Sequence, residues 1–89
     1  MSSESRRFDV ELSEQARRFL LDLPTNKRKE LAQFLIILFK SATPEESLEL
    51  ETKGQNFTDH LWVVGEFEIV YRCWPAEHRI AIGIIRRTN

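Results

Sequence analysis

The C-terminal third of the sequence constrains the fold most, because it predicts three consecutive antiparallel strands. Residues 60–74 and 79–87 are rich in β-branched and aromatic side chains, which a pleated, half-buried surface favours. Gly65 followed by Glu66 predicts a two-residue type II′ hairpin turn, since glycine adopts the required positive φ at little cost. Residues 75–78 predict the second turn. Two hairpins are therefore expected to join these strands.

The register of the strands follows from the turns, because paired residues of a hairpin share one face of the sheet. Ile69 is then opposite Trp62 in the first hairpin and opposite Ile84 in the second. The predicted core face is apolar: Trp62, Val64, Phe67, Ile69, Tyr71, Cys73, Ile80, Ile82 and Ile84. The opposite face mixes charged, small and apolar side chains: Leu61, Val63, Glu66, Glu68, Val70, Arg72, Trp74, Arg79, Ala81, Gly83, Ile85 and Arg87. We expect any functional site on this opposite face.

The length predicts one domain, residues 1–89, with residues 1–5 frayed. The one cysteine, Cys73, excludes an internal disulfide and fits a reducing compartment; on the core face we expect it to be packed and unreactive. No run approaches the roughly 20 apolar residues of a membrane span, and the polar start lacks the apolar segment of a signal peptide. We therefore expect a cytoplasmic protein.

The charge balance argues against a dedicated nucleic-acid binder. Thirteen basic and fourteen acidic residues give a net charge of −1 and a pI near 6.1. Such binders usually carry a basic excess, because neutralising phosphates supplies much of their affinity. Any nucleic-acid role must therefore rest on a local patch. The densest basic run is Lys27, Arg28 and Lys29, which either forms a solvated face or binds a phosphate.

The first half of the chain predicts one strand and two helices. Residues 7–12 alternate between polar and apolar side chains, as a strand does. Ser13 is a candidate N-cap for a helix over residues 14–23, which Pro24 ends. Thr25 or Asn26 then caps a second helix that runs to about Ser41. This order of elements predicts an α+β domain, with both helices packed on one face of the sheet.

The second helix carries an apolar stripe too broad for one contact surface. It consists of Leu31, Phe34, Leu35, Leu38 and Phe39, widened by Ile36 and Ile37. Such a helix needs cover on two sides, from the sheet and from either the first helix or a partner chain. The connector that follows, residues 43–54, is acidic and predicts a short helical turn after Pro44.

With these elements placed, the chain resembles the RelE/ParE superfamily of bacterial toxins from type II toxin–antitoxin pairs. The resemblance rests on the order of elements, on Ser13 followed by Ala-Arg-Arg-Phe-Leu from residue 16, and on Lys53-Gly54 before the meander. It rests above all on residues 67–72, Phe-Glu-Ile-Val-Tyr-Arg, which are similar to the superfamily's aromatic–Arg–aliphatic–Val–Tyr strand. The resemblance covers nearly the whole chain.

The resemblance implies a ribosome-dependent endoribonuclease that cuts mRNA and is neutralised by a small co-encoded antitoxin. That chemistry takes a proton from the 2′-hydroxyl, neutralises the pentavalent phosphate and protonates the leaving oxygen. The implied catalytic candidates are Glu68, Arg72, Arg87, Arg86 and Glu46, with Arg87 favoured over Arg86 for the open face. The RNA-binding candidates are Lys27, Arg28, Lys29, Lys53, Trp74 and Arg79. The expected antitoxin-binding residues are Ile36, Ile37 and Phe39.

The sequence departs from the superfamily's pattern at three places that bear on catalysis, and one of them is the preceding strand, where one branch has lysines and this chain has Leu61 and Val63. Glu68 occupies the position of the strand arginine, and the terminal tyrosine or histidine of active members is missing. Glu68 with Arg72 and Arg87 therefore forms either a surface ion-pair lattice or a re-tuned acid–base site. A gyrase-inhibiting ParE-type toxin and a catalytically inert binding module remain alternatives. His60 and His78 are too isolated to be metal ligands, and we expect no cofactor.

Overall fold

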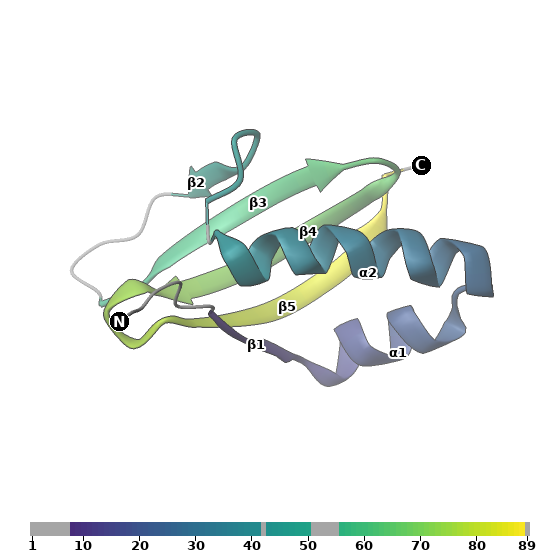
Figure 1. Ribbon diagram of the computed structural model, residues 1–89, viewed down its shortest axis with the longest axis horizontal. Helices are drawn as coiled ribbons and strands as arrows, with labels where there is room; N and C mark the ends of the chain where they lie inside the picture. Colours follow the sequence, from purple (N-terminus) through teal and green to yellow (C-terminus); the bar gives the residue numbers. More distant parts are fainter. Residues whose placement is uncertain (1–7, 42, 51–55, 89) are drawn as a thin grey trace, which may run out of the picture.

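A five-stranded sheet with two helices on one of its faces forms the fold (Figure 1). The computed structural model describes residues 8–41, 43–50 and 56–88. The elements in chain order are β1 (Asp9–Leu12), α1 (Glu14–Asp22), α2 (Thr25–Lys40), β2 (Leu48–Leu50), β3 (Thr58–Val64), β4 (Phe67–Trp74), a 3₁₀ turn η1 (Pro75–Glu77) and β5 (Arg79–Arg87). The α+β class and the placement of both helices on one face are as predicted. Residues 1–5 and Lys53, with Gly54, lie outside the described residues.

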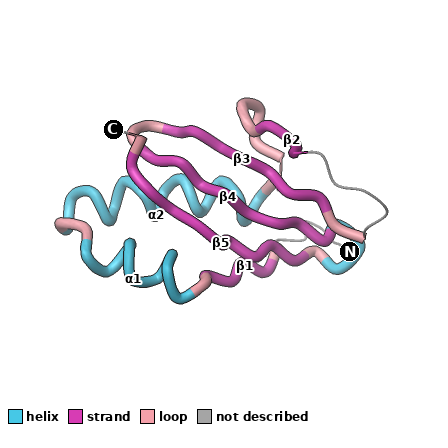
Figure 2. Tube along the Cα trace, turned by 180° about the vertical axis from the view of Figure 1, so that it is seen from behind, coloured by secondary structure: helices cyan, strands magenta, loops and turns pink. Residues whose placement is uncertain are grey.

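The strand order is β1-β5-β4-β3-β2, so β5 lies inside the sheet. Strands β3, β4 and β5 form the predicted meander, and β1 pairs with β5 in parallel, with Val10 opposite Ile80. This parallel pairing was not predicted. It places the N-terminal strand beside the C-terminal one, as Figure 2 shows from behind.

The two helices begin differently. Ser13 is the N-cap of α1, as predicted, because its Oγ accepts a hydrogen bond of 3.1 Å from the backbone N–H of Ala16. For α2 the predicted cap is wrong. Thr25 is already the first helical residue, Pro24 is the N-cap, and no side chain caps the helix. The two helices are therefore joined with almost no loop, because α2 begins directly after the proline.

The core lies between the helices and the sheet. Helix α2 contributes Leu31, Leu35 and Leu38, and α1 contributes Ala16. The sheet contributes Trp62, Phe67, Ile69, Tyr71, Cys73, Ile80, Ile82 and Ile85. Burial of one large apolar side chain contributes about 1.5–3 kcal/mol. This one-sided core leaves the other face of the sheet uncovered by helices (Figure 2).

The predicted register holds for the first hairpin and fails in the last strand. Val64 is opposite Phe67 and Trp62 is opposite Ile69, as predicted. In the second hairpin, however, Ile69 of β4 is opposite Ile85 of β5 and not opposite Ile84. The reason is a β-bulge: Tyr71 pairs with Ile82 and Val70 with Ile84, which leaves Gly83 as an extra residue between the two pairs.

The bulge exchanges the faces of all residues after Gly83. Ile85 is fully buried and Ile84 is 42% exposed, the reverse of the prediction. The start of α1 holds this geometry in place. Ser13 Oγ donates a hydrogen bond to the Gly83 carbonyl at 2.7 Å, and the Gln15 side chain bonds both the N–H and the carbonyl of Ile85, at 3.1 and 2.9 Å.

Strand β2 was not predicted. The expected turn after Pro44 is present, where the Ser47 N–H and Oγ both donate to the Pro44 carbonyl. Three residues, Leu48–Leu50, then pair antiparallel with β3, with Leu48 opposite Leu61. A three-residue Leu-Glu-Leu alternation inside an acidic connector is too short to be a strand signal.

We predict that Gly65→Ala lowers the free energy of unfolding by about 1–3 kcal/mol. Gly65 has a φ of 59°, and a Cβ there would lie 3.0 Å from the Phe34 ring. Gly83→Ala is the matched control, because its Cβ would meet only the Val70 carbonyl at 3.9 Å. Urea denaturation of both variants is the measurement. An equal loss in both would contradict the positive-φ argument.

Candidate functional site on the open sheet face

The sheet face away from the helices is organised in rows that run across the strands. Cross-strand pairing places Leu48 beside Leu61, Leu61 beside Val70, and Val70 beside Ile84. These four aliphatic side chains form one continuous row over β2, β3, β4 and β5, which we call the aliphatic row. Leu48 and Ile84 are 62% and 42% exposed.

Ion pairs flank the aliphatic row on both sides. On one side Arg86 Nε donates to Glu68 Oε1 at 2.6 Å, across β4 and β5. On the other side Arg72 Nε donates to Asp59 Oδ1 at 2.7 Å, across β3 and β4. This hydrogen bond from Arg72 to Asp59 raises the pKa of the guanidinium, so Arg72 stays charged. Each arginine is thus bound to a carboxylate on the neighbouring strand.

Aromatic rings cover the end of the face near η1. The Arg79 guanidinium lies 3.8 Å from the centre of the Trp74 ring, and the Arg72 guanidinium lies 3.8 Å from the centre of the Phe57 ring. The rings of Phe57 and Trp74 meet edge to face at 5.9 Å. Such guanidinium–ring contacts fix the arginines in place and contribute about 0.5–1 kcal/mol each at exposed sites.

A shallow hollow of about 320 Å³ lies between the aromatic end and the aliphatic row. Its lining is mostly apolar: Leu50, Asp59, Val70, Tyr71, Arg72, Trp74, Ala81 and Gly83. The hollow is open at Ala81 and Gly83, because the side chain of Ala81 is only a methyl group and Gly83 has none. The hollow therefore offers an apolar floor with one ion pair at its rim.

The described ion pairs of this face carry a small excess of negative charge. Three arginines, Arg72, Arg79 and Arg86, bridge to four carboxylates, those of Asp59, Glu11, Glu77 and Glu68, a balance of −1. A surface that binds phosphates needs a local excess of positive charge. The arrangement is therefore a lattice of paired charges, with one carboxylate in excess, around an apolar centre.

The predicted catalytic residues do not form one cluster. Glu68 and Arg72 are four residues apart on β4, a separation of about 13 Å along a strand. Arg86, and not Arg87, faces the open side, because the bulge moves Arg86 opposite Glu68. The favoured position of Arg87 was therefore wrong: Arg87 is opposite the core residue Phe67, and its Nη2 donates to Glu66 at 3.1 Å.

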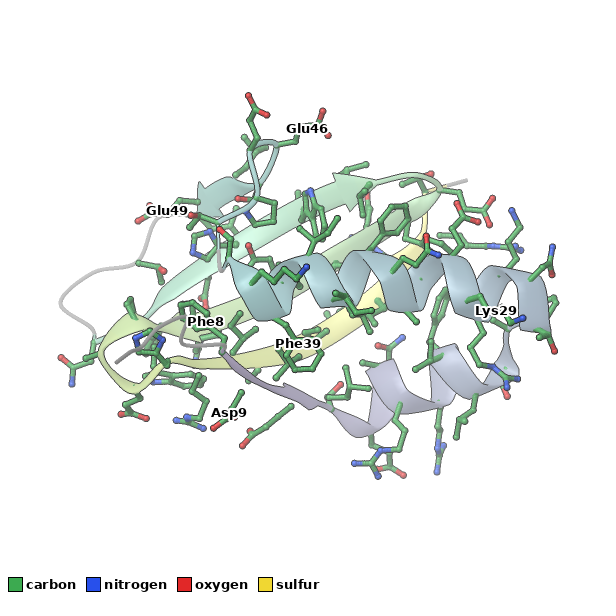
Figure 3. All side chains as sticks on the ribbon, viewed as in Figure 1. Phe8, Asp9, Lys29, Phe39, Glu46 and Glu49 are labelled. Carbon is green, nitrogen blue, oxygen red and sulfur yellow. The ribbon has the colours of Figure 1, made fainter. Side chains whose placement is uncertain are left out.

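Glu46 is also separate from the open face. It lies exposed in the turn before β2 and points away from the sheet (Figure 3). Glu66, at the hairpin turn, instead has two basic neighbours among the described residues, Lys27 and Arg87. The hydrogen bond from Lys27, and then that from Arg87, lowers the pKa of Glu66. This cluster links the start of α2 to the β3–β4 turn.

The basic run at the start of α2 has internal partners. Lys27 Nζ lies 3.1 Å from Glu66 Oε2 and 3.6 Å from Glu30 Oε1. Arg28 Nη2 donates to the carbonyls of Leu21 and Leu23, which lie at the end of α1. Lys29 is exposed at the N-terminal end of α2 (Figure 3), where it makes no ion pair with another described residue. Two of the three side chains therefore hold the fold together.

Asp59 and Phe57 were missed as site residues. The predicted strand began at His60, so the residues before it were not placed on the sheet. Extending the Gly65-Glu66 hairpin register would have found Asp59, because it lies directly opposite Arg72. Phe57 precedes Thr58, the first residue of β3, and carries little strand signal by itself.

On the helix side, α2 presents a second exposed apolar surface. Ile36, Ile37 and Phe39 are 48%, 43% and 37% exposed, as the broad stripe predicted. Ile36 and Phe39 line a groove of about 510 Å³ together with Phe8, Asp9 and Lys40. We call these residues the α2 groove. Figure 3 shows Phe8 and Phe39 on this side of the molecule.

Three titratable groups of the core face, His60, Tyr71 and Cys73, are buried, and of these only Tyr71 lines the hollow. Burial lowers the pKa of His60, whose Nε2 is hydrogen-bonded to Thr58 Oγ1 at 2.8 Å and whose ring stacks on Tyr71. Burial raises the pKa of Tyr71 to about 12 and also raises that of the Cys73 thiol. These groups stay neutral at pH 7. Within the described residues, no cluster of histidine, cysteine and carboxylate side chains could hold a metal ion.

The fold is that of the RelE toxins. No protein-family model and no curated protein sequence matches this chain. The archaeal RelE–RelB complex from Pyrococcus horikoshii OT3 matches with a TM-score of 0.79 and 20% identity, over 91% of this chain and 94% of that one. The RelBE2 toxin–antitoxin complex from Mycobacterium tuberculosis matches with a TM-score of 0.73 and 17% identity, over 91% of this chain and 98% of that one.

The isolated RelE toxin of E. coli matches with a TM-score of 0.66 and 13% identity, over 92% of this chain and 85% of that one. At these identities the likeness establishes the fold alone. No helix in the described part of the chain is long and apolar enough to cross a membrane.

We predict that Arg28→Ala lowers the free energy of unfolding by about 1–2 kcal/mol, because two carbonyls at the end of α1 lose a charged donor. Lys29→Ala, one residue along the same helix, is the control and should change stability by less than about 0.5 kcal/mol. Thermal denaturation of the two variants makes the comparison. If Arg28→Ala were as stable as Lys29→Ala, the hydrogen bonds of Arg28 to the end of α1 would not stabilise the fold.

Proposed function

We propose that this chain is the toxin of a toxin–antitoxin pair and acts in the cytoplasm. The observation that carries the proposal is the RelE fold, matched over more than nine-tenths of the chain by structures solved as RelE–RelB and RelBE2 complexes. The exposed apolar surface of α2 supports it, because an antitoxin segment would bury that surface.

The α2 groove is the proposed antitoxin contact. Ile36 and Phe39 line the groove, and Ile37 is exposed on the same helix outside its lining; neither the sheet nor α1 buries these large apolar side chains. An amphipathic or extended segment of a small partner, laid between α2 and β1, would cover them. The groove has two charged lining residues, Asp9 and Lys40, and Lys40 would favour a carboxylate on that segment.

We predict that Ile36→Asp combined with Ile37→Asp weakens binding of the co-encoded antitoxin at least a hundredfold, because two large side chains lose their apolar contact with it. Leu21→Asp is the matched control, since Leu21 is 60% exposed on α1 and outside the groove. Calorimetric titration with the protein encoded beside this chain measures the effect. Unchanged affinity in the double variant would place the antitoxin elsewhere.

The finer proposal is ribosome-dependent cleavage of mRNA at the open face. In that reaction the 2′-oxygen forms a bond to phosphorus while the bond to the 5′-oxygen breaks, and a proton passes from the first oxygen to the second. Glu68 would accept the proton, and Arg86, which is hydrogen-bonded to Glu68, would bind the phosphate charge. The exposure of the Arg86 side chain, 63%, supports this role, since its outer nitrogens remain accessible.

A second candidate is a toxin that does not cleave RNA and acts through a protein target. It is favoured by the ion-pair lattice, in which each arginine of the open face is already bound to a carboxylate. A phosphate would have to displace these carboxylates or bind beside them. The third candidate is a catalytically inert binding module, which the same ion-pair lattice supports.

Primer extension on mRNA in a reconstituted translation reaction separates these candidates. Under the nuclease proposal, cuts appear only with ribosomes, and Arg86→Ala reduces them more than tenfold, about 1.4 kcal/mol of transition-state stabilisation. Arg87→Ala is the matched control and should keep its activity, because Arg87 does not face the open side. Intact message in the presence of stably folded protein would reject the nuclease proposal and leave the second candidate.

A further inference from the structure

We propose that the open sheet face docks an amphipathic helix of a protein partner, laid across the strands over the aliphatic row, with basic residues toward the β1 edge. The proposal deepens the second candidate function and rests on it: the partner helix is the contact through which a non-nucleolytic toxin would act. It concerns a surface opposite to the α2 groove.

The length of the aliphatic row fits a short helix. The row crosses from β2 to β5, which is three strand spacings of about 4.8 Å, or about 14 Å in all. A helix rises 1.5 Å per residue, so about ten residues span that distance. Three apolar side chains at positions i, i+4 and i+7 of such a helix would lie over the row from Leu48 to Ile84.

The direction across the strands follows from the pattern of side chains. Along β4 the open face alternates charge and apolar groups, Glu68 then Val70 then Arg72, so a helix parallel to this strand would desolvate two arginine–carboxylate pairs. Across the strands, Leu61, Val70 and their neighbours offer uninterrupted apolar surface. A helix in this direction leaves the pairs at its edges, in contact with water.

The described ion pairs of the face favour a basic partner. The three bridging arginines meet four carboxylates, and the excess lies toward β1, where Arg79 bridges to both Glu11 and Glu77. A lysine or arginine at the corresponding end of the helix would complete this group. The same excess disfavours RNA, whose phosphates need unpaired cations.

The test uses ¹⁵N-labelled chain and three synthetic 14-residue peptides. The first has leucines at i, i+4 and i+7 with two lysines at one end; the second has glutamates in place of the lysines; the third has asparagines in place of the leucines. We expect the first peptide to bind saturably and to shift the amide signals of Leu48, Leu61, Val70 and Ile84. The second and third should bind at least tenfold more weakly.

Two variants of the chain make the site specific. Leu48→Asn, at the exposed end of the row, and Ile84→Asn should each weaken binding of the first peptide at least tenfold, while Leu21→Asn on α1 should not. If Ile84→Asn does not fold, Leu48→Asn still tests the site. Leu48 is 62% exposed, so its substitution leaves the fold intact. Equal binding of the leucine and asparagine peptides, or shifts confined to the α2 groove, would overturn the proposal.

A single-stranded RNA oligonucleotide, titrated in parallel, is the remaining arm. If it shifted the amides of the row at lower concentration than the first peptide, the face would be an RNA site and the proposal would be wrong. These titrations do not depend on toxicity. A chain that binds the peptide but has no toxic effect would refute the proposed function and leave the docking site.

Discussion

The bulge at Gly83 is the constraint on which the rest of the structure depends. One unpaired residue in β5 decides that Ile85 enters the core and that Ile84 and Arg86 face outward. The start of α1 maintains it, since Ser13 caps its own helix and also bonds the Gly83 carbonyl, while Gln15 occupies the backbone groups of Ile85 as a neighbouring strand would. A helix cap and a strand irregularity are thus one hydrogen-bonded unit, and the chemistry of the open face follows from it.

The same face illustrates how a fold can be kept while its surface chemistry changes. With Glu68 on β4 and Asp59 on β3, each arginine of the open face has an anionic neighbour at hydrogen-bond distance. The cations that would attract a phosphate are therefore engaged within the sheet. What remains accessible between them is aliphatic, and aliphatic surface favours a protein contact over a nucleic-acid one. Charge pairing across strands, more than the number of arginines, determines which partner the face can accept.

Much of the fold could be predicted from the sequence, because it is encoded in local signals: Ser13 before an apolar helical period, Pro24 after it, and the Gly65-Glu66 turn. The first hairpin's register followed from that turn alone. The register of β5 could not be predicted, because the bulge depends on Ser13 and Gln15, some seventy residues away. The error exchanged Arg86 with Arg87 in the candidate site. Similarly, the basic run seemed available for a ligand only because the carbonyls that Arg28 binds lie on another helix.

The position of β5 inside the sheet also governs the order in which this domain can be assembled. Strand β1 is made early, yet its partner residues begin at Arg79, so it has nothing to pair with until most of the domain has been synthesised. Contacts of such long sequence separation form slowly, because the intervening chain must be closed into a loop first. Helix α1, which packs mainly on β5, waits as well. During translation the emerging chain would thus expose the apolar side of α2 before the sheet exists to cover it.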